Sequence, residues 1–381
     1  MTEPAPLRDC PVCGSTDVHA SIRRERLPVF QNVVYPSPAA ARAAPQMPLV
    51  LGTCGACGFS FNAVFRPEAV VYDKAYDNHV ASAMFTRYYH DIATMLIERW
   101  GLTSGTVYDV GCGKGEFLRI LCALAPGIRG VGVDPSCEPV KEGNFELIDT
   151  VFDQSLFTGD TKLVILRHVL EHIAEPVAFL RQLREAMPAA PLYVEVPDLH
   201  YILEQRAFWD FCYEHCNYFD PDSLRRALEL ASFDVVDQQR AFGDQYQWAL
   251  SLPTAGAPVA ARADGATAVA RVARYAEQER DAIAAIERRA VDQGGVVIWG
   301  MATKGTMLSM MMDDALVHGG IDANPGKQGR FAAGSGLAIH APAWIADRPA
   351  APTILAMNPN YVDEIAAVAR AIRGDAIVEA I

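Results

Sequence analysis

The pair Glu214-His215 lies at the centre of an unusual segment, residues 208–219, in which six of twelve side chains are aromatic. An imidazole next to a carboxylate in an aromatic pocket can act as a general base, because the pKa of histidine lies near neutral pH. The same pattern also suits a histidine that is buried and hydrogen-bonded inside an apolar hairpin. The segment therefore indicates either a catalytic base or a structural histidine.

A glycine-rich loop could hold a nucleotide-like ligand. An apolar strand is expected to end at Asp109 and a helix to begin at about Glu116. Between them lie Gly111, Gly113 and Gly115. Glycine lets the backbone pass close to a ligand, and the start of a helix offers unpaired N–H groups. The next strand ends at Asp134, 21 residues after Gly113, where dinucleotide-binding folds place the acid that binds ribose hydroxyls.

Two Cys-x-x-Cys pairs near the N-terminus offer four thiolates. They are Cys10 and Cys13, then Cys54 and Cys57, and a glycine follows each pair. Four thiolates can close a tetrahedral structural zinc site, which leaves no open position for catalysis. The 40 residues between the pairs predict a small β-rich insert. Four reduced cysteines in a core are the alternative.

The sequence His168-x-x-Glu171-His172 matches the inverted zinc-protease motif H-x-x-E-H. That motif requires an active-site helix. Here it follows an apolar strand directly, and the next helix is expected to start only near Pro176. The context therefore argues against a protease.

The stretch from Asp109 to Gly115 resembles motif I of class I methyltransferases that use S-adenosyl-L-methionine (AdoMet), with the pattern D-x-G-x-G-x-G. The resemblance implies an α/β fold with a Rossmann-like AdoMet-binding domain. It implies that the glycines border the methionine part of AdoMet and that Asp134 binds its ribose. It further implies adenine contacts from Phe152 and Asp153, and a position for His168 beside the cofactor.

The order of motifs along nearly the whole chain resembles that of sugar C-methyltransferases. Those enzymes combine the paired cysteines, the AdoMet loop and a Tyr-Glu-His-x-x-Tyr-Phe stretch, and they act on nucleotide-linked 4-keto-deoxysugars. The resemblance implies that His215 removes a proton next to the ketone while Glu214 orients or charges the site. It assigns Tyr76 to the sugar site, and substrate contacts to Tyr213 and Tyr218.

The C-terminal region agrees with that family. Residues 296–305 end in a G-x-x-x-K-G loop, and residues 322–330 match D-x-N-P-x-K-Q-G-R. The region predicts a second Rossmann-like domain. Three basic residues there could bind a diphosphate through charge-assisted bonds, or could form a solvated basic face: Lys304, Lys327 and Arg330.

Two departures from the family pattern fall near the expected sugar site. Cys212 stands where family members often have tyrosine, and residues 243–247 replace a Gly-Gly-Ser-x-Arg strand. They leave the sugar and the accepting atom open. An O- or N-methyltransferase and a non-catalytic AdoMet-binding zinc scaffold are the alternatives.

The predicted organisation is a zinc-binding module (1–66), an AdoMet-binding domain (67–252), a linker with a connector helix (253–290) and a C-terminal Rossmann-like domain (291–381). A helix is expected over residues 69–100, and the connector helix over 271–289, after an Ala/Gly/Pro-rich linker at 253–265.

Composition limits the partners of this 381-residue chain. Apolar residues make up 51% and charged residues 21%, as in a folded protein. The net charge of 33 − 46 = −13 argues against a nucleic-acid surface. No apolar run approaches the length of a membrane span, and no signal peptide is evident. We therefore expect a cytoplasmic monomer or homodimer that binds a nucleotide sugar, AdoMet and structural zinc.

Overall fold

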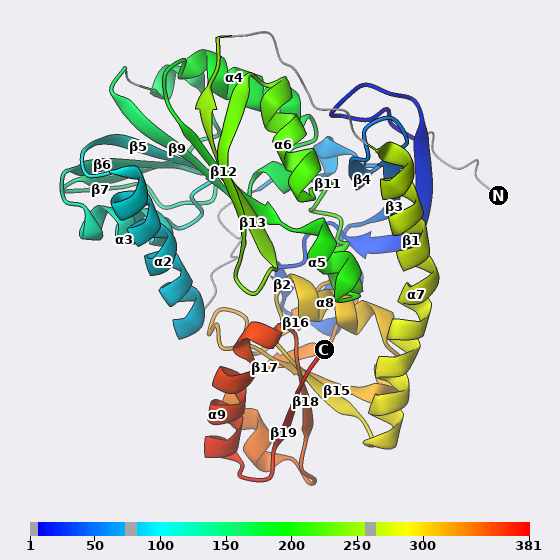
Figure 1. The fold of residues 1–381 in the computed structure, drawn as a ribbon. Helices are drawn as coiled ribbons and strands as arrows, with labels where there is room; N and C mark the ends of the chain where they lie inside the picture. Colours follow the sequence, from blue (N-terminus) through cyan, green and yellow to red (C-terminus); the bar gives the residue numbers. More distant parts are fainter. Residues whose placement is uncertain (1–6, 73–81, 158, 256–263) are drawn as a thin grey trace.

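The computed structural model describes residues 7–72, 82–157, 159–255 and 264–381. Their strands form three sheets, of four, eight and seven strands. Figure 1 shows the eight-stranded and seven-stranded sheets at opposite ends of the molecule, with helix α7 (Gly265–Asp292) along one side. Among the described helices, none combines the length and apolar composition needed to cross a bilayer.

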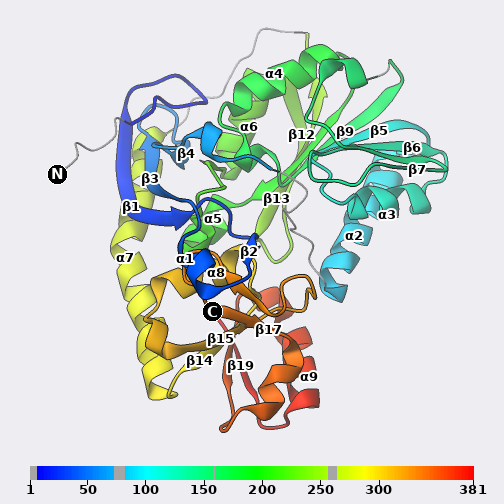
Figure 2. The ribbon, with the colours of Figure 1, turned by 180° about the vertical axis from the view of Figure 1, so that it is seen from behind.

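The four-stranded sheet is built mainly from the segment between the two cysteine pairs, so the expected β-rich insert is confirmed. Its order is β1-β3-β4-β11, and β1 and β3 pair antiparallel along their length. The strands are β1 (Val18–Pro28), β3 (Gln46–Cys54), β4 (Ser60–Asn62) and β11 (Asn217–Tyr218), and helix α1 (Pro38–Arg42) lies between β1 and β3 in sequence. Strand β11 belongs to the aromatic segment 208–219, and its pairing with β4 fixes this segment against the N-terminal module (Figure 1). Figure 2 shows β1, β3 and β4 of that module beside α7.

The eight-stranded sheet has the order β12-β13-β10-β9-β5-β6-β8-β7, and its five strands from β10 to β8 are parallel. The strands are β5 (Gly105–Val110), β6 (Ile128–Val133), β7 (Val140–Glu142), β8 (Phe145–Ile148), β9 (Thr161–Arg167), β10 (Leu192–Pro197), β12 (Phe233–Ala241) and β13 (Tyr246–Pro253). The helices of this part are α2 (Ala83–Trp100), α3 (Glu116–Leu124), α4 (Pro176–Ala186), α5 (Leu199–Glu204) and α6 (Pro221–Leu230).

Alternate residues of the central strands face opposite sides of this sheet. Leu163 and Ile165 pack in the apolar cluster formed with α2 and α3, whereas Val164 and Leu166 pack in the cluster formed with α4 and α6. Helices on both faces explain why these strands are apolar throughout. The α/β class I methyltransferase architecture expected from the sequence is confirmed.

The helix expected over residues 69–100 is shorter than predicted. A 3-10 turn covers Pro67–Ala69, and α2 begins only at Ala83. The Ser82 hydroxyl accepts a hydrogen bond from the Phe85 backbone N–H at 3.3 Å, so this residue caps the helix. The predicted start was too early because the apolar residues at helical spacing, from Met84 to Leu96, all lie within α2 and do not mark where the helix begins.

The seven-stranded sheet has the order β19-β18-β14-β15-β17-β16-β2, and β19, β18, β14, β15 and β17 are parallel. The strands are β14 (Val296–Trp299), β15 (Val317–Ile321), β16 (Arg330–Ala332), β17 (Ala338–His340), β18 (Thr353–Ala356), β19 (Ile377–Ala380) and β2 (Val34–Tyr35), and the helices are α8 (Thr303–Met311) and α9 (Val362–Ile372). The second Rossmann-like domain is therefore present. Strand β2 comes from the N-terminal module, so this sheet and the four-stranded sheet both cross the domain limits drawn from the sequence.

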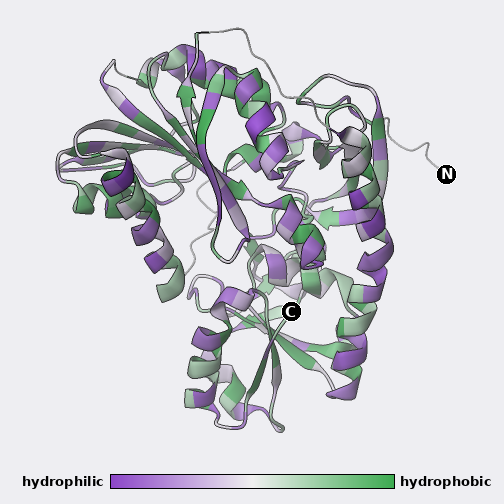
Figure 3. Cartoon of the chain, in the orientation of Figure 1, coloured by the Kyte–Doolittle hydropathy of each residue, from purple (hydrophilic) through white to green (hydrophobic). Residues whose placement is uncertain are grey.

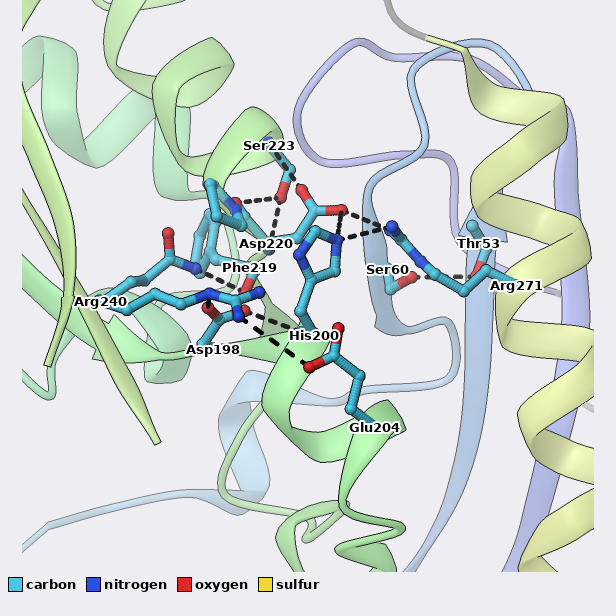
Figure 4. Close-up of polar contacts among 12 residues, drawn as sticks. Thr53, Ser60, Asp198, His200, Glu204, Phe219, Asp220, Ser223, Arg240 and Arg271 are labelled. Carbon is cyan, nitrogen blue, oxygen red and sulfur yellow. Dashed lines mark hydrogen bonds and ion pairs between the residues drawn. The ribbon is translucent and has the colours of Figure 1, made fainter. Parts of the chain in front are cut away.

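Helix α7 ties the three parts together and is longer than the predicted connector. Figure 4 shows Arg271 of α7 reaching Asp220 at the start of α6 and His200 of α5, with nitrogen–oxygen and nitrogen–nitrogen distances of 2.6 Å. Arg24 of β1 forms a buried ion pair with Glu279 of α7 at 2.8 Å. Figure 3 shows polar bands along α7 and apolar strands in the C-terminal sheet, as expected for an exposed helix beside a packed core.

Candidate active site

A cavity of about 390 Å³ lies where the eight-stranded and seven-stranded sheets face each other. Residues that follow the carboxyl ends of parallel strands line it from both sides, among them His168 after β9 and Gly300 after β14. Asn32 of the N-terminal module also lines it. Ligands of open parallel sheets bind beyond the carboxyl ends of the strands, so two such sites meet in one cavity.

The glycine loop after β5 borders the cavity through Gly111 and Gly113. Gly111 has a φ of 78°, and an added Cβ atom would lie 2.3 Å from Val169 Cγ2, so only glycine fits. Asp134 shapes the loop, because its carboxylate accepts hydrogen bonds from the Gly113 N–H at 2.8 Å and from the Ser136 N–H at 2.7 Å. Asp134 and Gly115, which precedes α3, stand behind the lining.

Asp109 offers the cavity a carboxylate with an unsatisfied oxygen. Its Oδ1 atom is buried without a hydrogen-bond partner among the described residues. Burial, opposed by the positive charge of Arg167, raises the pKa of Asp109 to about 7. With Glu116 also on the wall, this side suits a ligand that brings a cationic group, as AdoMet does with its sulfonium and ammonium groups. The residues present therefore fit AdoMet.

His168 belongs to a buried ionic network beside that side of the cavity. Glu195 accepts hydrogen bonds from Arg167 at 2.8 Å and from the Tyr88 hydroxyl at 2.7 Å, and its Oε1 lies 3.0 Å from His168 Nε2. Burial alone would lower the pKa of His168, but Glu171 and Glu195 outweigh it and raise the value to about 9. His168 therefore carries a positive charge at neutral pH.

His215 reaches the cavity, as the sequence predicts for the candidate base. Its ring packs edge-on against His172, with 4.9 Å between the ring centres. Burial, together with the nearby histidines and Lys304, lowers the pKa of His215 to about 3, although Glu171 opposes the shift. The ring is therefore neutral over the whole physiological pH range and holds a free lone pair.

Glu214 points away from the cavity that His215 enters. Its Oε1 atom accepts a hydrogen bond from the backbone N–H of Gln31 at 2.7 Å, and its carbonyl oxygen lies 2.9 Å from His172 Nδ1. The predicted substrate contacts Tyr213 and Tyr218 also lie outside the lining. The Tyr213 hydroxyl accepts a hydrogen bond from the backbone N–H of Arg66 at 3.1 Å, and the Tyr218 hydroxyl donates one to the Cys212 carbonyl. Tyr76 lies outside the described residues.

Glu171 and His172 are site residues that the sequence reasoning set aside with the protease motif. Together with His215 they place carboxylate and imidazole atoms within 4.8 Å of one another. His168 does not join this group, and the motif forms a single 3-10 turn, Leu170–His172, instead of a helix. The repeated dipeptide Glu-His at 171–172 and 214–215 was the signal that could have linked the two segments.

Two of the three predicted phosphate ligands reach the cavity, and both have acidic neighbours. Lys304 Nζ lies 3.0 Å from Asp210 Oδ2, and Lys327 Nζ lies 3.8 Å from Asp322 Oδ2. Arg330 begins β16, is exposed and does not line the cavity. The expected adenine residues also lie elsewhere: Phe152 packs on Phe157 and Phe179, and Asp153 is exposed at a 3-10 turn.

The four cysteines of the N-terminal module meet as predicted. Two sulfur–sulfur distances are 3.6 Å, between Cys10 and Cys57 and between Cys13 and Cys54, and all four sulfurs lie within 4.8 Å of one another. A zinc ion with Zn–S bonds of about 2.3 Å separates its sulfur ligands by roughly 3.8 Å. The group fits a closed structural zinc site.

Family models match two parts of the chain. A methyltransferase domain matches residues 80–238, and a C-methyltransferase C-terminal domain matches residues 260–378. No curated protein sequence matches the chain.

Several solved methyltransferases match part of the chain. CalO1, a methyltransferase in calicheamicin biosynthesis, is 18% identical with a TM-score of 0.34, over 43% of this chain and 54% of that chain, so the present chain spans about half the length of CalO1. Magnesium protoporphyrin IX methyltransferase from Synechocystis PCC 6803 is 16% identical with a TM-score of 0.37, over 47% of this chain and 91% of that chain. The chain therefore combines a methyltransferase domain, whose glycine loop and acidic cavity wall suit AdoMet, with a C-methyltransferase C-terminal domain.

Proposed function

We propose that the enzyme transfers a methyl group from AdoMet to a carbon atom of a nucleotide-diphosphate-linked keto-deoxysugar. The observation that carries the proposal is the position of His215, in the cavity between the glycine loop and the domain that matches C-methyltransferases. A neutral imidazole here can act on a substrate held by one domain while the methyl donor is held by the other. The predicted roles of Lys304 and Lys327 in binding the diphosphate form part of this proposal.

The chemistry begins with removal of a proton from the carbon next to the ketone. The proton moves to His215, and the C–H electron pair becomes that of an enolate. The enolate carbon then forms a bond to the methyl group that AdoMet supplies, and S-adenosylhomocysteine leaves. General bases typically contribute 10²–10⁴-fold to such steps, and holding both partners in line contributes more.

The surroundings of His215 explain how a ring with so low a pKa can accept this proton. The negative charge that develops on the enolate lies beside the imidazole, so it raises the pKa of His215 during the transfer. The carboxylate of Glu171 also favours the protonated ring. His172 is held by the Glu214 carbonyl and lies 2.8 Å from the Tyr72 hydroxyl, which keeps it against His215. We assign Glu171 and His172 as positioning residues.

A second candidate function is methylation of an amino or hydroxyl group. Among the described residues, the cavity wall carries six carboxyl side chains and three lysine or arginine residues: Asp109, Glu116, Glu171, Asp210, Asp322 and Glu364 against Arg167, Lys304 and Lys327. This excess of acids would suit an aminosugar. On that route His215 takes the proton from nitrogen or oxygen instead of carbon.

The first experiment separates the two routes. The enzyme is incubated with S-adenosylhomocysteine and a panel of keto-sugar nucleotides in deuterated water, and exchange next to the ketone is measured by mass spectrometry. Carbon methylation predicts exchange without methyl transfer, and AdoMet then adds one methyl to the same panel member. Methylation without any exchange would favour the amino or hydroxyl route.

A matched pair of variants tests the base. His215→Asn should abolish both exchange and methylation, while His90→Asn, at an exposed position of α2, should leave both unchanged. Full turnover by His215→Asn would contradict the assignment.

We also propose that Cys10, Cys13, Cys54 and Cys57 bind structural zinc. Metal analysis of the purified chain should find about one zinc per molecule, and Cys54→Ser should lose it together with part of the folding stability. Cys122→Ser, at a buried cysteine outside this group, should retain the metal.

A further inference from the structure

The tip of the β12–β13 hairpin touches the C-terminal domain at the edge of the cavity. Gln245, which lies in the segment that departs from the family pattern, lines the cavity and is only 5% exposed. Its Oε1 atom accepts a hydrogen bond from Asn358 Nδ2 at 2.8 Å. Beside it, Asn360 Nδ2 donates to the Phe242 carbonyl at 2.8 Å. Two side-chain amides therefore hold the hairpin tip on the C-terminal domain.

The orientation of the Gln245 amide follows from this chain of hydrogen bonds. The backbone N–H of Asn360 donates to Asn358 Oδ1 at 3.0 Å, and a backbone N–H can only donate. The NH2 group of Asn358 must therefore point toward Gln245, and the Gln245 side-chain oxygen accepts its hydrogen bond. The Nε2 group of Gln245 faces away from Asn358 and has no acceptor among the residues that the structure describes.

Gln245 is buried as a residue but lines the cavity, so its NH2 group can donate to an acceptor that a ligand supplies there. We propose that Gln245 is a specificity-determining residue whose Nε2 donates a hydrogen bond to an uncharged oxygen, a ketone or hydroxyl, of the methyl-accepting substrate. The proposal rests on the function proposed above and deepens it. An ammonium group at the same place would meet another donor, so the arrangement selects keto and hydroxy sugars over aminosugars.

The first variant removes the donor and keeps the contact between domains. In Gln245→Glu a carboxylate oxygen still accepts from Asn358 Nδ2, while the other oxygen replaces Nε2 in the cavity. The dissociation constant of a keto-sugar nucleotide should rise about tenfold or more, the size of one lost hydrogen bond plus repulsion between acceptors. The dissociation constant of S-adenosylhomocysteine should not change.

The second variant, a substitution at position 358, reverses the orientation of the Gln245 side-chain amide without changing Gln245 itself. In Asn358→Asp the carboxylate can still accept from the Asn360 N–H, but it no longer donates to Gln245. The amide of Gln245 must then turn its Nε2 group toward position 358 and its oxygen into the cavity. The variant should show the same weakening as Gln245→Glu. Asn360→Ala is the matched control: it loses the bond to the Phe242 carbonyl, keeps the backbone N–H, and should bind sugar like the parent chain.

The measurement is calorimetric titration of the full chain, saturated with S-adenosylhomocysteine, with uridine and thymidine diphosphate derivatives of 4-keto-6-deoxyglucose and of a 4-aminosugar. Equal affinity in the parent chain and both variants would overturn the inference. Weakening by Gln245→Glu alone would also overturn it, because the effect would then come from charge and not from amide orientation. Failure of the parent chain to bind or methylate any of these probes would instead contradict the proposed function and remove the inference with it.

Discussion

Two strand–glycine–helix turns face each other across the cavity, and they use the same backbone device. In the methyltransferase domain β5 leads through Gly111 into α3, and in the C-terminal domain β14 leads through Gly300 into α8. Both glycines have positive φ values, 78° and 106°. The neighbouring strands β6 and β15 are each followed by an acid, Asp134 and Asp322.

The two turns differ in charge. Asp109 and Glu116 stand at the first turn, where the cations on the nearby wall, Arg167 and His168, are both paired with Glu195. Lys304 and Lys327 stand at the second, each near an acid. In the function proposed above, the same backbone geometry serves opposite ligands: the first turn binds the cationic methyl donor, and the second binds a phosphorylated substrate. His215 lies between them.

The largest effect on catalysis should come from His215, which lies in the cavity that the two turns line. His215→Asn should lower kcat for methylation by at least 10²–10³-fold, because it removes the base while leaving both turns intact. Binding of S-adenosylhomocysteine and of a nucleoside diphosphate should stay within about twofold, because the substitution leaves the glycine loop and both lysines unchanged. Rapid-quench turnover and calorimetry measure the two quantities. A parallel loss of binding would show that His215 is a structural residue.

Replacing each of the two glycines with alanine should weaken binding of one ligand at a time, and so show that the two turns bind different ligands. Gly111→Ala forces a Cβ atom against Val169 and a side chain into positive φ, and should weaken S-adenosylhomocysteine binding by about 10- to 100-fold. In Gly300→Ala the nearest atom to the added Cβ, Met357 Cβ, lies at 3.5 Å, so the only cost is the strain of a positive φ. This variant should therefore weaken nucleoside diphosphate binding by a smaller factor. Calorimetry with each ligand gives four dissociation constants. If either variant weakens the binding of both ligands equally, the two turns are not separate binding sites.

The pH dependence of cofactor binding should come from Asp109. Its raised pKa, about 7, means that the free protein holds it partly protonated at neutral pH. The ammonium group of S-adenosylhomocysteine favours the ionised form, so the dissociation constant of this ligand should rise as the pH falls below 7, by up to about tenfold per pH unit. The contribution of Asp109 to folding stability has the opposite sign, because its folded pKa exceeds the unfolded value: stability increases as the pH falls from 7 towards 4. Asp109→Asn should flatten the binding profile, and an unchanged profile would exclude Asp109.

Some features of the two turns and of the N-terminal module could be predicted from the sequence. The AdoMet loop was predictable because its acid, glycines, helix and following acid lie within one βαβ unit, so local spacing defines the geometry. The cysteine pairs were predictable because zinc chemistry requires four ligands together. For His215, residue type and composition left a catalytic base and a structural histidine both open, and the family resemblance favoured the base.

What the sequence could not supply are the contacts between distant segments. The bond between Gln245 and Asn358 joins residues 113 positions apart, and no periodic pattern marks either end. Strands β2 and β11 have two residues each, too short to show alternation, yet they carry the chain across the predicted domain limits. The register of β11 sets Tyr218 into the apolar core, away from the substrate role that the family resemblance implied.

The smallest effect concerns the acid that accompanies Lys304. If the second turn binds phosphate, Asp210 competes with the ligand for the lysine charge, since Asp210 Oδ2 lies 3.0 Å from Lys304 Nζ. Asp210→Asn keeps an oxygen that can accept from Lys304 but removes the competing charge, so nucleoside diphosphate affinity should increase by about two- to tenfold. Lys304→Gln should change it in the opposite direction. Titration with uridine diphosphate at two salt concentrations measures both, and the gain in Asp210→Asn should shrink at high salt. Unchanged affinity in both variants would mean that the pair serves only to join η4 (Phe208–Asp210) to α8, and the charge contrast between the two turns would then rest on Lys327 alone.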